Sequence, residues 1–298
     1  MRKSHNKYYK AVLFDWDGTA VADRYADSTE VADALIPLLE QGVFLAVISG
    51  TSYENIGPSL VEKIPPALRS NLYFGLARGA YTFTFDSTGE RVTLAELVPD
   101  KDELVQLHTG VFNFHLWLLE KYGYETDIVF TRPNYCKIDM LPGLHRGDRM
   151  FISSGEMQML NDSLHEHGVH ETVPELFERL RNEIRTAGMD STVRISTDAK
   201  YFEAGLGSKT DNTRIIWERL AQAGVKSHEV AVFGDEFSQL AEGITGSDGF
   251  IMIPELSGAD FYDVSEAPQL LPEGVTHLGG GPESFIRFLH GQNHSSAL

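Results

Sequence analysis

Two aspartates stand two positions apart where an apolar run of the chain ends. The run 12–14 is followed by Asp15, Trp16, Asp17 and a Gly-Thr turn. An isolated Asp-x-Asp would mean little, because aspartate and glycine are ordinary turn residues. Two carboxylates this close repel each other unless a cation lies between them. The pattern therefore indicates a site that binds a cation.

Three more polar clusters follow apolar runs or open helical patterns. They are Ser49, Lys209 and the pair Asp235–Glu236. In a doubly wound sheet such positions meet in one crevice, so we expect these side chains to lie near Asp15 and Asp17. Carboxylates from two strands can hold a hard cation such as Mg2+, and a hydroxyl or an ammonium group can bind phosphoryl oxygens. An aspartate in such a site can also act as a nucleophile that forms an acyl phosphate.

The elements that position these residues alternate between strands and helices at both ends of the chain. Strands are expected at 12–14, 43–48, 72–74 and 230–233. Helices are expected at 28–41, 53–68, 213–220 and 282–289. Such alternation predicts a parallel sheet with crossover helices.

The middle of the chain has a different pattern. Apolar residues at helical spacing predict a long amphipathic helix over 104–122, and a capping-box signal at Thr172 predicts a second helix. Strand-like segments are expected at 127–131, 135–141 and 192–196. We therefore predict an α/β fold with a doubly wound, Rossmann-like parallel-sheet core. The core comprises residues 1–88 and 200–298, and residues 89–199 form an inserted α+β cap.

Charge and composition limit the partners of the chain. Its 298 residues carry a formal net charge of -18, whereas nucleic acids and anionic membranes need a basic surface. We therefore expect neither as a partner. The single cysteine, Cys136, excludes an intramolecular disulfide. No apolar run has the length of a membrane span, and the first ten residues lack the apolar core of a signal peptide, so a cytoplasmic location is expected.

The four clusters, in this order, resemble the motifs of the haloacid dehalogenase superfamily of phosphohydrolases. The segments that match are 14–19, 47–50, 207–209 and 233–236. Members with a large cap between the second and third motifs are most similar, such as Cof-type sugar phosphatases, trehalose- and sucrose-phosphate phosphatases and phosphomannomutase. The resemblance implies a Mg2+-dependent phosphatase that hydrolyses a small phosphorylated metabolite, a sugar or polyol phosphate, through an aspartyl-phosphate.

The resemblance also implies the catalytic and metal-binding roles. Asp15 would attack phosphorus, and Asp17 would protonate the leaving alkoxide and then activate the hydrolytic water. Mg2+ would be held by Asp15, the backbone carbonyl of Asp17 and Asp235. Cof-like members usually carry an Asn-Asp pair a few residues after the fourth-motif Asp, but this chain has Ser238–Gln239 there. Glu236 is therefore expected to supply the missing charge, through a water on the metal.

The phosphate pocket implied by the resemblance contains four further residues. Ser49 would hydrogen-bond a phosphoryl oxygen, and Lys209 would screen the charge between nucleophile and phosphate. Thr19 and Gly50 would shape the pocket through hydroxyl or backbone contacts. Lys200 lies nine positions before Lys209, but the Gly-x-Ser-Lys context favours Lys209.

Several alternatives stay open. Asp17 is typical of phosphatases and phosphomutases in this family, so a phosphomutase with the same core is an alternative. The altered Ser238–Gln239 leaves a non-catalytic binding protein as a third hypothesis. Basic residues of the cap could bind substrate or lie scattered on the surface; they are Arg132, Lys137, Arg146 and Arg149. The substrate and the oligomeric state are not predicted.

Overall fold

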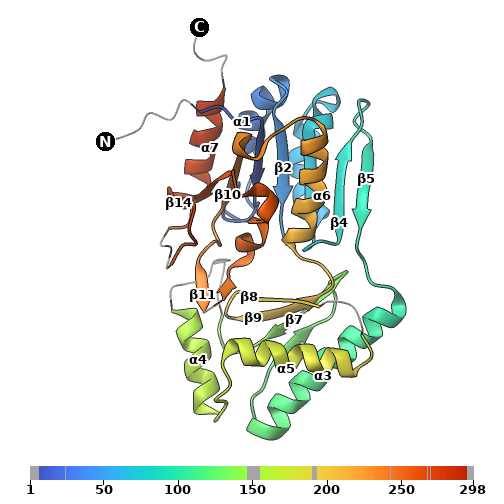
Figure 1. Cartoon of the computed structure of the whole chain (residues 1–298), viewed down its shortest axis with the longest axis vertical. Coiled ribbons are helices and arrows are strands. Elements are labelled where there is room, and N and C mark those ends of the chain that lie inside the picture. Colours follow the sequence, from blue (N-terminus) through green and yellow to red (C-terminus); the bar gives the residue numbers. More distant parts are fainter. Residues whose placement is uncertain are drawn as a thin grey trace.

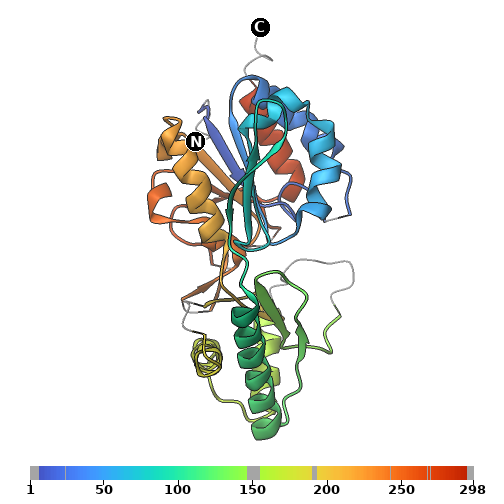
Figure 2. The ribbon, with the colours of Figure 1, turned by 90° about the vertical axis from the view of Figure 1, so that its right-hand side faces the viewer.

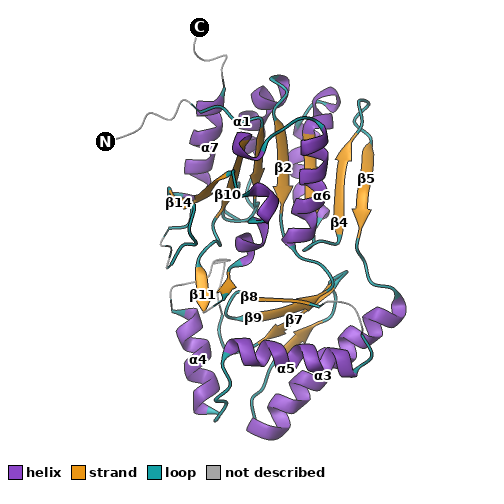
Figure 3. Ribbon diagram, viewed as in Figure 1, coloured by secondary structure: helices purple, strands orange, loops and turns teal. Residues whose placement is uncertain are grey.

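The computed structural model describes residues 7–23, 25–145, 155–189, 193–241, 243–266, 268 and 270–293. These residues form a sheet of eight strands, a sheet of four strands and a short two-stranded hairpin, with helices packed on the two larger sheets (Figure 1, Figure 3). The α/β class with a separate cap is confirmed. Within the described ranges, no helix is both long and apolar enough to cross a membrane.

The eight-stranded sheet has the order β14-β13-β10-β1-β2-β3-β4-β5. Its strands are β1 (Ala11–Phe14), β2 (Phe44–Ile48), β3 (Leu72–Leu76), β4 (Tyr81–Phe85), β5 (Arg91–Glu96), β10 (Val230–Gly234), β13 (Asp260–Asp263) and β14 (Val275–His277). Strands from β14 to β3 run parallel, whereas β4 and β5 form an antiparallel edge. Because β1 lies between β2 and β10, the chain order reverses beside β1. Its carboxyl end is therefore the expected ligand crevice.

Helices cover both faces of this sheet. One face carries α1 (Thr29–Glu40), α2 (Tyr53–Leu60) and α7 (Gly281–Gln292), and the other carries α6 (Lys209–Gln222) (Figure 2). In β1, Val12 and Phe14 join the apolar cluster under α1 and α7, and Ala11 and Leu13 join the cluster under α6. This alternation buries β1 on both faces, as a central parallel strand requires.

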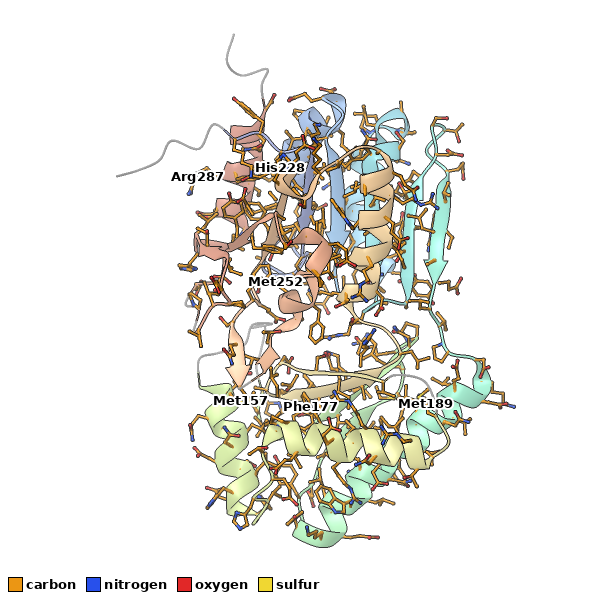
Figure 4. The ribbon with its side chains drawn as sticks, viewed as in Figure 1. Met157, Phe177, Met189, His228, Met252 and Arg287 are labelled. Carbon is orange, nitrogen blue, oxygen red and sulfur yellow. The ribbon has the colours of Figure 1, made fainter. Side chains whose placement is uncertain are left out.

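The cap is an antiparallel sheet of order β6-β7-β9-β8 with helices on one face. Its elements are α3 (Lys101–Tyr122), β6 (Asp127–Val129), β7 (Tyr135–Asp139), α4 (Glu156–Glu166), α5 (Val173–Thr186), β8 (Arg194–Thr197) and β9 (Tyr201–Gly205). Met157 of α4 and Phe177 of α5 point into the space between these helices and the sheet (Figure 4).

The two faces of the cap sheet differ in polarity. Cys136, Ile138 and Phe202 lie in the apolar cluster with the cap helices. Lys137 and Glu203 alternate with them along β7 and β9 and pair with each other. Because side chains of a strand alternate between faces, the charged residues point away from the helices, toward the core.

Two strands lie on the other side of the domain boundaries expected at 88/89 and 199/200. Strand β5 pairs with β4 in the core sheet, and β9 pairs with β7 and β8 in the cap sheet. Alternating polarity predicts a strand but does not specify which of two sheets it joins. We therefore propose that the cap begins after β5 and ends after β9.

A short hairpin of the core reaches the cap. It consists of β11 (Gln239–Ala241) and β12 (Ile244–Thr245). Leu240 and Ile244 belong to the apolar cluster of the cap, and β12 contacts β8 (Figure 1). The hairpin thus connects the chain after Asp235 with the underside of the cap.

Candidate active site

Asp15 lies at the carboxyl end of β1, next to the reversal in strand order. Its backbone N–H donates to the carbonyl of Phe233 at 3.0 Å, which fixes it against the end of β10. The residue is only 6% exposed, and Asp17, two residues on, is half-buried. Burial raises the pKa of Asp15 to about 7, although Lys209 lowers it, and Asp248 and Asp17 raise it further. The carboxylate is therefore costly to ionise without a compensating cation.

Lys209, at the first position of α6, is a cation in direct contact with Asp15. Its Nζ donates to Asp15 Oδ1 and to Asp248 Oδ1, both at 2.8 Å. Burial acts to lower the pKa of Lys209, but the two aspartates outweigh burial and raise it. Lys209 is therefore charged, and it links the carboxyl end of β1 to the segment that follows β12. The competing Lys200 lies in the cap, where it pairs with Asp139, so the preference for Lys209 is supported by its position.

Asp248 holds the loop after β10. Its Oδ2 accepts the backbone N–H groups of Asp235 at 3.0 Å and Glu236 at 2.8 Å. A Cβ built on Gly234 would lie 2.4 Å from Asp248 Oδ2, so only glycine leaves room for this carboxylate. Asp248 is fully buried, and one oxygen orders the loop while the other faces Lys209.

The carboxylates of Asp15, Asp235 and Asp248 form one group. Each offers an oxygen, and these oxygens lie within 4.8 Å of one another. Burial, followed by Asp248 and Glu236, raises the pKa of Asp235 well above its ordinary value. Three carboxylates against the single ammonium of Lys209 leave an excess of negative charge. An all-oxygen set with that excess fits a hard divalent cation such as Mg2+.

Two expected residues have different positions in the site. Asp248 joins the group although the sequence analysis did not select it, whereas the Glu236 carboxylate lies outside the group of three among the described residues, and its role through a water on the metal stays a prediction. The Thr19 hydroxyl donates to Asp235 Oδ1 at 2.9 Å and so orients this carboxylate, and its contribution to the phosphate pocket stays a prediction. Asp17 contributes no carboxylate to the group, and its backbone carbonyl as a metal ligand stays a prediction.

Ser49 and Gly50 follow β2 as expected. Ser49 is buried, its N–H donates to the Gly75 carbonyl at 2.9 Å, and its Oγ accepts the Thr51 N–H at 3.3 Å. The loop is therefore anchored to β3 at the same edge of the sheet as Asp15. Its role in phosphate binding stays a prediction.

Sequence reasoning missed two charged residues near this edge. Asp248 is 13 positions after Asp235, beyond the β11–β12 hairpin, and its one signal was an acidic residue at the start of a short helix, Ser247–Ile251. Arg78 follows β3, so the strand-end argument that selected Asp15 and Ser49 applied to it equally. Its guanidinium donates to Ser196 Oγ at 2.9 Å and pairs with Glu203 of the cap.

Of the basic residues predicted for the cap, the two that the structure describes differ in exposure. Lys137 is half-buried and pairs with Glu203 at 2.7 Å, facing the core. Arg132 is exposed, and Arg146 and Arg149 lie outside the described residues. Of the described pair, Lys137 alone has the position expected of a residue near the cleft.

Solved phosphatase structures share the fold of this chain, in agreement with the fold implied by the resemblance of its four motifs. Trehalose-6-phosphate phosphatase from Aspergillus fumigatus matches with a TM-score of 0.57 and 16% identity, covering 97% of this chain and 94% of that chain. N-terminally truncated IMP-nucleotidase from Plasmodium falciparum matches with a TM-score of 0.55 and 14% identity, covering 95% of this chain and 70% of that chain.

Comparison by sequence identifies no relative of the chain. No protein-family model matches the chain, and no curated protein matches it. At identities of 14–16% the structural matches establish the fold, and the chemistry must be argued from the site.

Proposed function

We propose that the protein is a Mg2+-dependent phosphatase of a small phosphorylated metabolite, acting through an aspartyl-phosphate on Asp15. The observation that carries the proposal is the group of Asp15, Asp235 and Asp248, with Lys209 bridging two of them. Such a group combines a nucleophile with cations that neutralise phosphoryl charge. When bound, Mg2+ would supply charge neutralisation for the phosphoryl oxygens, held by these three carboxylates.

The chain's own residues account for the two chemical steps. In the first, an Asp15 oxygen bonds to phosphorus, the bond to the leaving oxygen breaks, and Asp17 donates a proton to the alkoxide. In the second, Asp17 takes a proton from water, which attacks phosphorus and releases phosphate and free Asp15. Lys209 orients Asp15 through its 2.8 Å contact and favours the ionised carboxylate, against burial, which raises the pKa of Asp15. The half-buried position of Asp17 supports this role, because it can reach both the leaving group and solvent water.

We propose a sugar or polyol phosphate as the substrate. The cap face that points toward the core is lined by polar and charged side chains, including Tyr135, Arg194 and Glu203. Structures with this fold include enzymes named for trehalose 6-phosphate and for IMP, so both sugar phosphates and nucleotides belong in the test. A cytoplasmic location stays a prediction from the sequence.

The experiment is a panel of phosphomonoesters assayed for phosphate release with Mg2+ and with EDTA. We expect Mg2+-dependent release that is lost in Asp15→Asn. Absence of release across the panel overturns the proposal and favours a binding protein. An isomerised sugar phosphate formed without phosphate release favours the phosphomutase.

A further inference from the structure

Arg78 lies in the loop between β3 and β4, directly over the second-motif loop. The Ala77 N–H donates to the Thr51 carbonyl at 3.0 Å, which holds the two loops together. A Cβ built on Gly50 would lie 3.5 Å from Arg78 Nε, so the side chain passes over Gly50 in van der Waals contact. The Arg78 backbone has a φ of 52°, which side-chain-bearing residues rarely adopt. Strained backbone of this kind is often found at functional sites.

The cap holds Arg78 at both ends. Asn134 Nδ2 of the cap donates to the Arg78 carbonyl at 2.9 Å. The guanidinium donates to Ser196 Oγ and pairs with Glu203, which is only 2% exposed. Lys137 holds the other Glu203 oxygen at 2.7 Å. Burial acts to raise the pKa of Glu203, but Arg78 and Lys137 outweigh burial and lower it, so Glu203 is an ionised anchor.

One small cavity joins Arg78 to the catalytic centre. It is lined by Arg78, Ser196, Glu203, Ser208 and Lys209, among others, and its volume is about 10 Å³. That volume holds about one water. A phosphoryl group does not fit in a space of that size, so a phosphate site that uses Arg78 must lie beside the cavity, at the Gly50 loop over which Arg78 passes.

We propose, on the basis of the proposed phosphatase function, that Arg78 is a second phosphoryl-binding cation and that Glu203 of the cap orients its guanidinium. A phosphoryl group bound at Ser49 and Gly50 lies between Lys209 and Arg78. A guanidinium binds phosphoryl oxygens through two parallel hydrogen bonds and is stronger there than a point charge. Because Glu203 orients it only when the cap is docked, closure of the cap completes the phosphate site.

Glu203 has a competing role that makes the proposal testable. If it bound substrate hydroxyls directly, a Glu203 variant would impair only substrates whose leaving group reaches the cap. If it acts through Arg78, the same variant impairs the hydrolysis of every phosphorylated compound, acyl phosphates as well as phosphate esters. Acetyl phosphate, whose leaving group is too small to reach the cap sheet, distinguishes the two roles.

The experiment compares Arg78→Asn, Arg78→Lys and Glu203→Gln, with Arg91→Asn as a matched control. Asparagine tolerates the left-handed backbone at position 78 better than alanine does. Arg91 stacks on Phe83, 3.8 Å from its ring centre, and serves as a control for the loss of an arginine elsewhere on the core. Thermal melts show that each variant is folded. Measured quantities are kcat and KM for acetyl phosphate and for the best panel substrate, and the inhibition constant of inorganic phosphate.

We expect Arg78→Asn to lower kcat by about 10²- to 10³-fold on both substrates, as loss of one transition-state donor does. It should also weaken inhibition by phosphate, whereas Arg78→Lys retains part of both. Glu203→Gln should lower kcat on acetyl phosphate as well, and the double variant should be no worse than Arg78→Asn alone. That non-additivity is a readout that a merely structural role of Glu203 would not produce.

Two results overturn the proposal. One is unchanged kcat and phosphate inhibition in Arg78→Asn. The other is a Glu203→Gln defect confined to the larger substrate. If no phosphate ester is hydrolysed at all, the phosphatase function fails, and calorimetric binding of inorganic phosphate to the wild type and Arg78→Asn still tests Arg78. Equal affinities then refute it, and weaker binding by the variant supports it.

Discussion

Replacing Asp15 by Asn should stabilise the metal-free protein at alkaline pH. The pKa of Asp15 rises from an ordinary value near 3.8 to about 7 in the fold, with burial as the largest cause. In the unfolded chain the carboxyl ionises near pH 4, whereas the folded protein keeps the proton until about pH 7. The unfolded state therefore loses its proton first as pH rises, and stability falls across that window.

The size of the stability change follows from the pH range between the two pKa values of Asp15. Each pH unit between the two pKa values costs about 1.4 kcal/mol, so the free energy of unfolding of the wild type should fall by about 3 kcal/mol between pH 5 and pH 8. Asp15→Asn lacks this titration. Lys209 keeps its 2.8 Å contact with Asp248 in the variant, so the substitution leaves no lysine unpaired. Carboxylates outside the site are common to both proteins and cancel in the comparison. The charge of Asp15 also raises the pKa of Asp235, so the loss of that charge in the variant adds to its advantage at pH 8.

The assay is urea unfolding of both proteins in EDTA at pH 5 and pH 8. We expect the advantage of Asp15→Asn to grow by about 3 kcal/mol from the lower to the higher pH. Added Mg2+ at pH 8 should stabilise the wild type more than the variant, because metal binding adds to stability by mass action. An advantage of equal size at both pH values would refute the reasoning.

Three further predictions concern other residues. Asp248→Asn should raise the Mg2+ concentration needed for half-maximal activity by about 10- to 100-fold, measured by titrating activity against Mg2+. An unchanged concentration would exclude Asp248 from the metal site. Lys200→Met should lower the free energy of unfolding by about 3 kcal/mol, because it leaves Asp139 buried and unpaired, while kcat of the folded enzyme stays unchanged; urea unfolding and steady-state kinetics check both. Cys136 should not react with a thiol reagent in the folded protein, since burial raises its pKa to about 12; rapid labelling without urea would contradict the structure.

The convergence of the candidate site residues at one edge of the sheet was predictable because it depends on a topological regularity. Asp15, Ser49 and Asp235 each follow a buried strand, and parallel strands bring their carboxyl ends together whatever the distance in sequence. The contact of Lys209 with Asp15 follows from a related argument, since Lys209 opens a helix that packs on β2 and β3 and begins at the edge where the strands end. These positions needed no knowledge of side-chain packing.

Other features depend on packing that the sequence pattern does not encode. Asp248 lies 13 positions after Asp235 because the β11–β12 hairpin intervenes. The sequence pattern therefore favoured Glu236, the acid next to Asp235. The helix expected over 53–68 ends at Leu60 and gives way to short 3-10 turns, because Pro65 and Pro66 cannot continue it. Strand β9 has the composition of a core strand, and only its partners assign it to the cap.

The β11–β12 hairpin limits how this protein can be divided into parts. It belongs to the core by sequence, between Asp235 and Asp248, yet Leu240 and Ile244 are buried in the apolar cluster of the cap. Deleting the cap would therefore expose two aliphatic side chains on the segment between two carboxylates of the candidate site. A shortened protein or a chimera with a foreign cap needs this hairpin rebuilt as well, because the unit that recombines is the cap together with its hairpin.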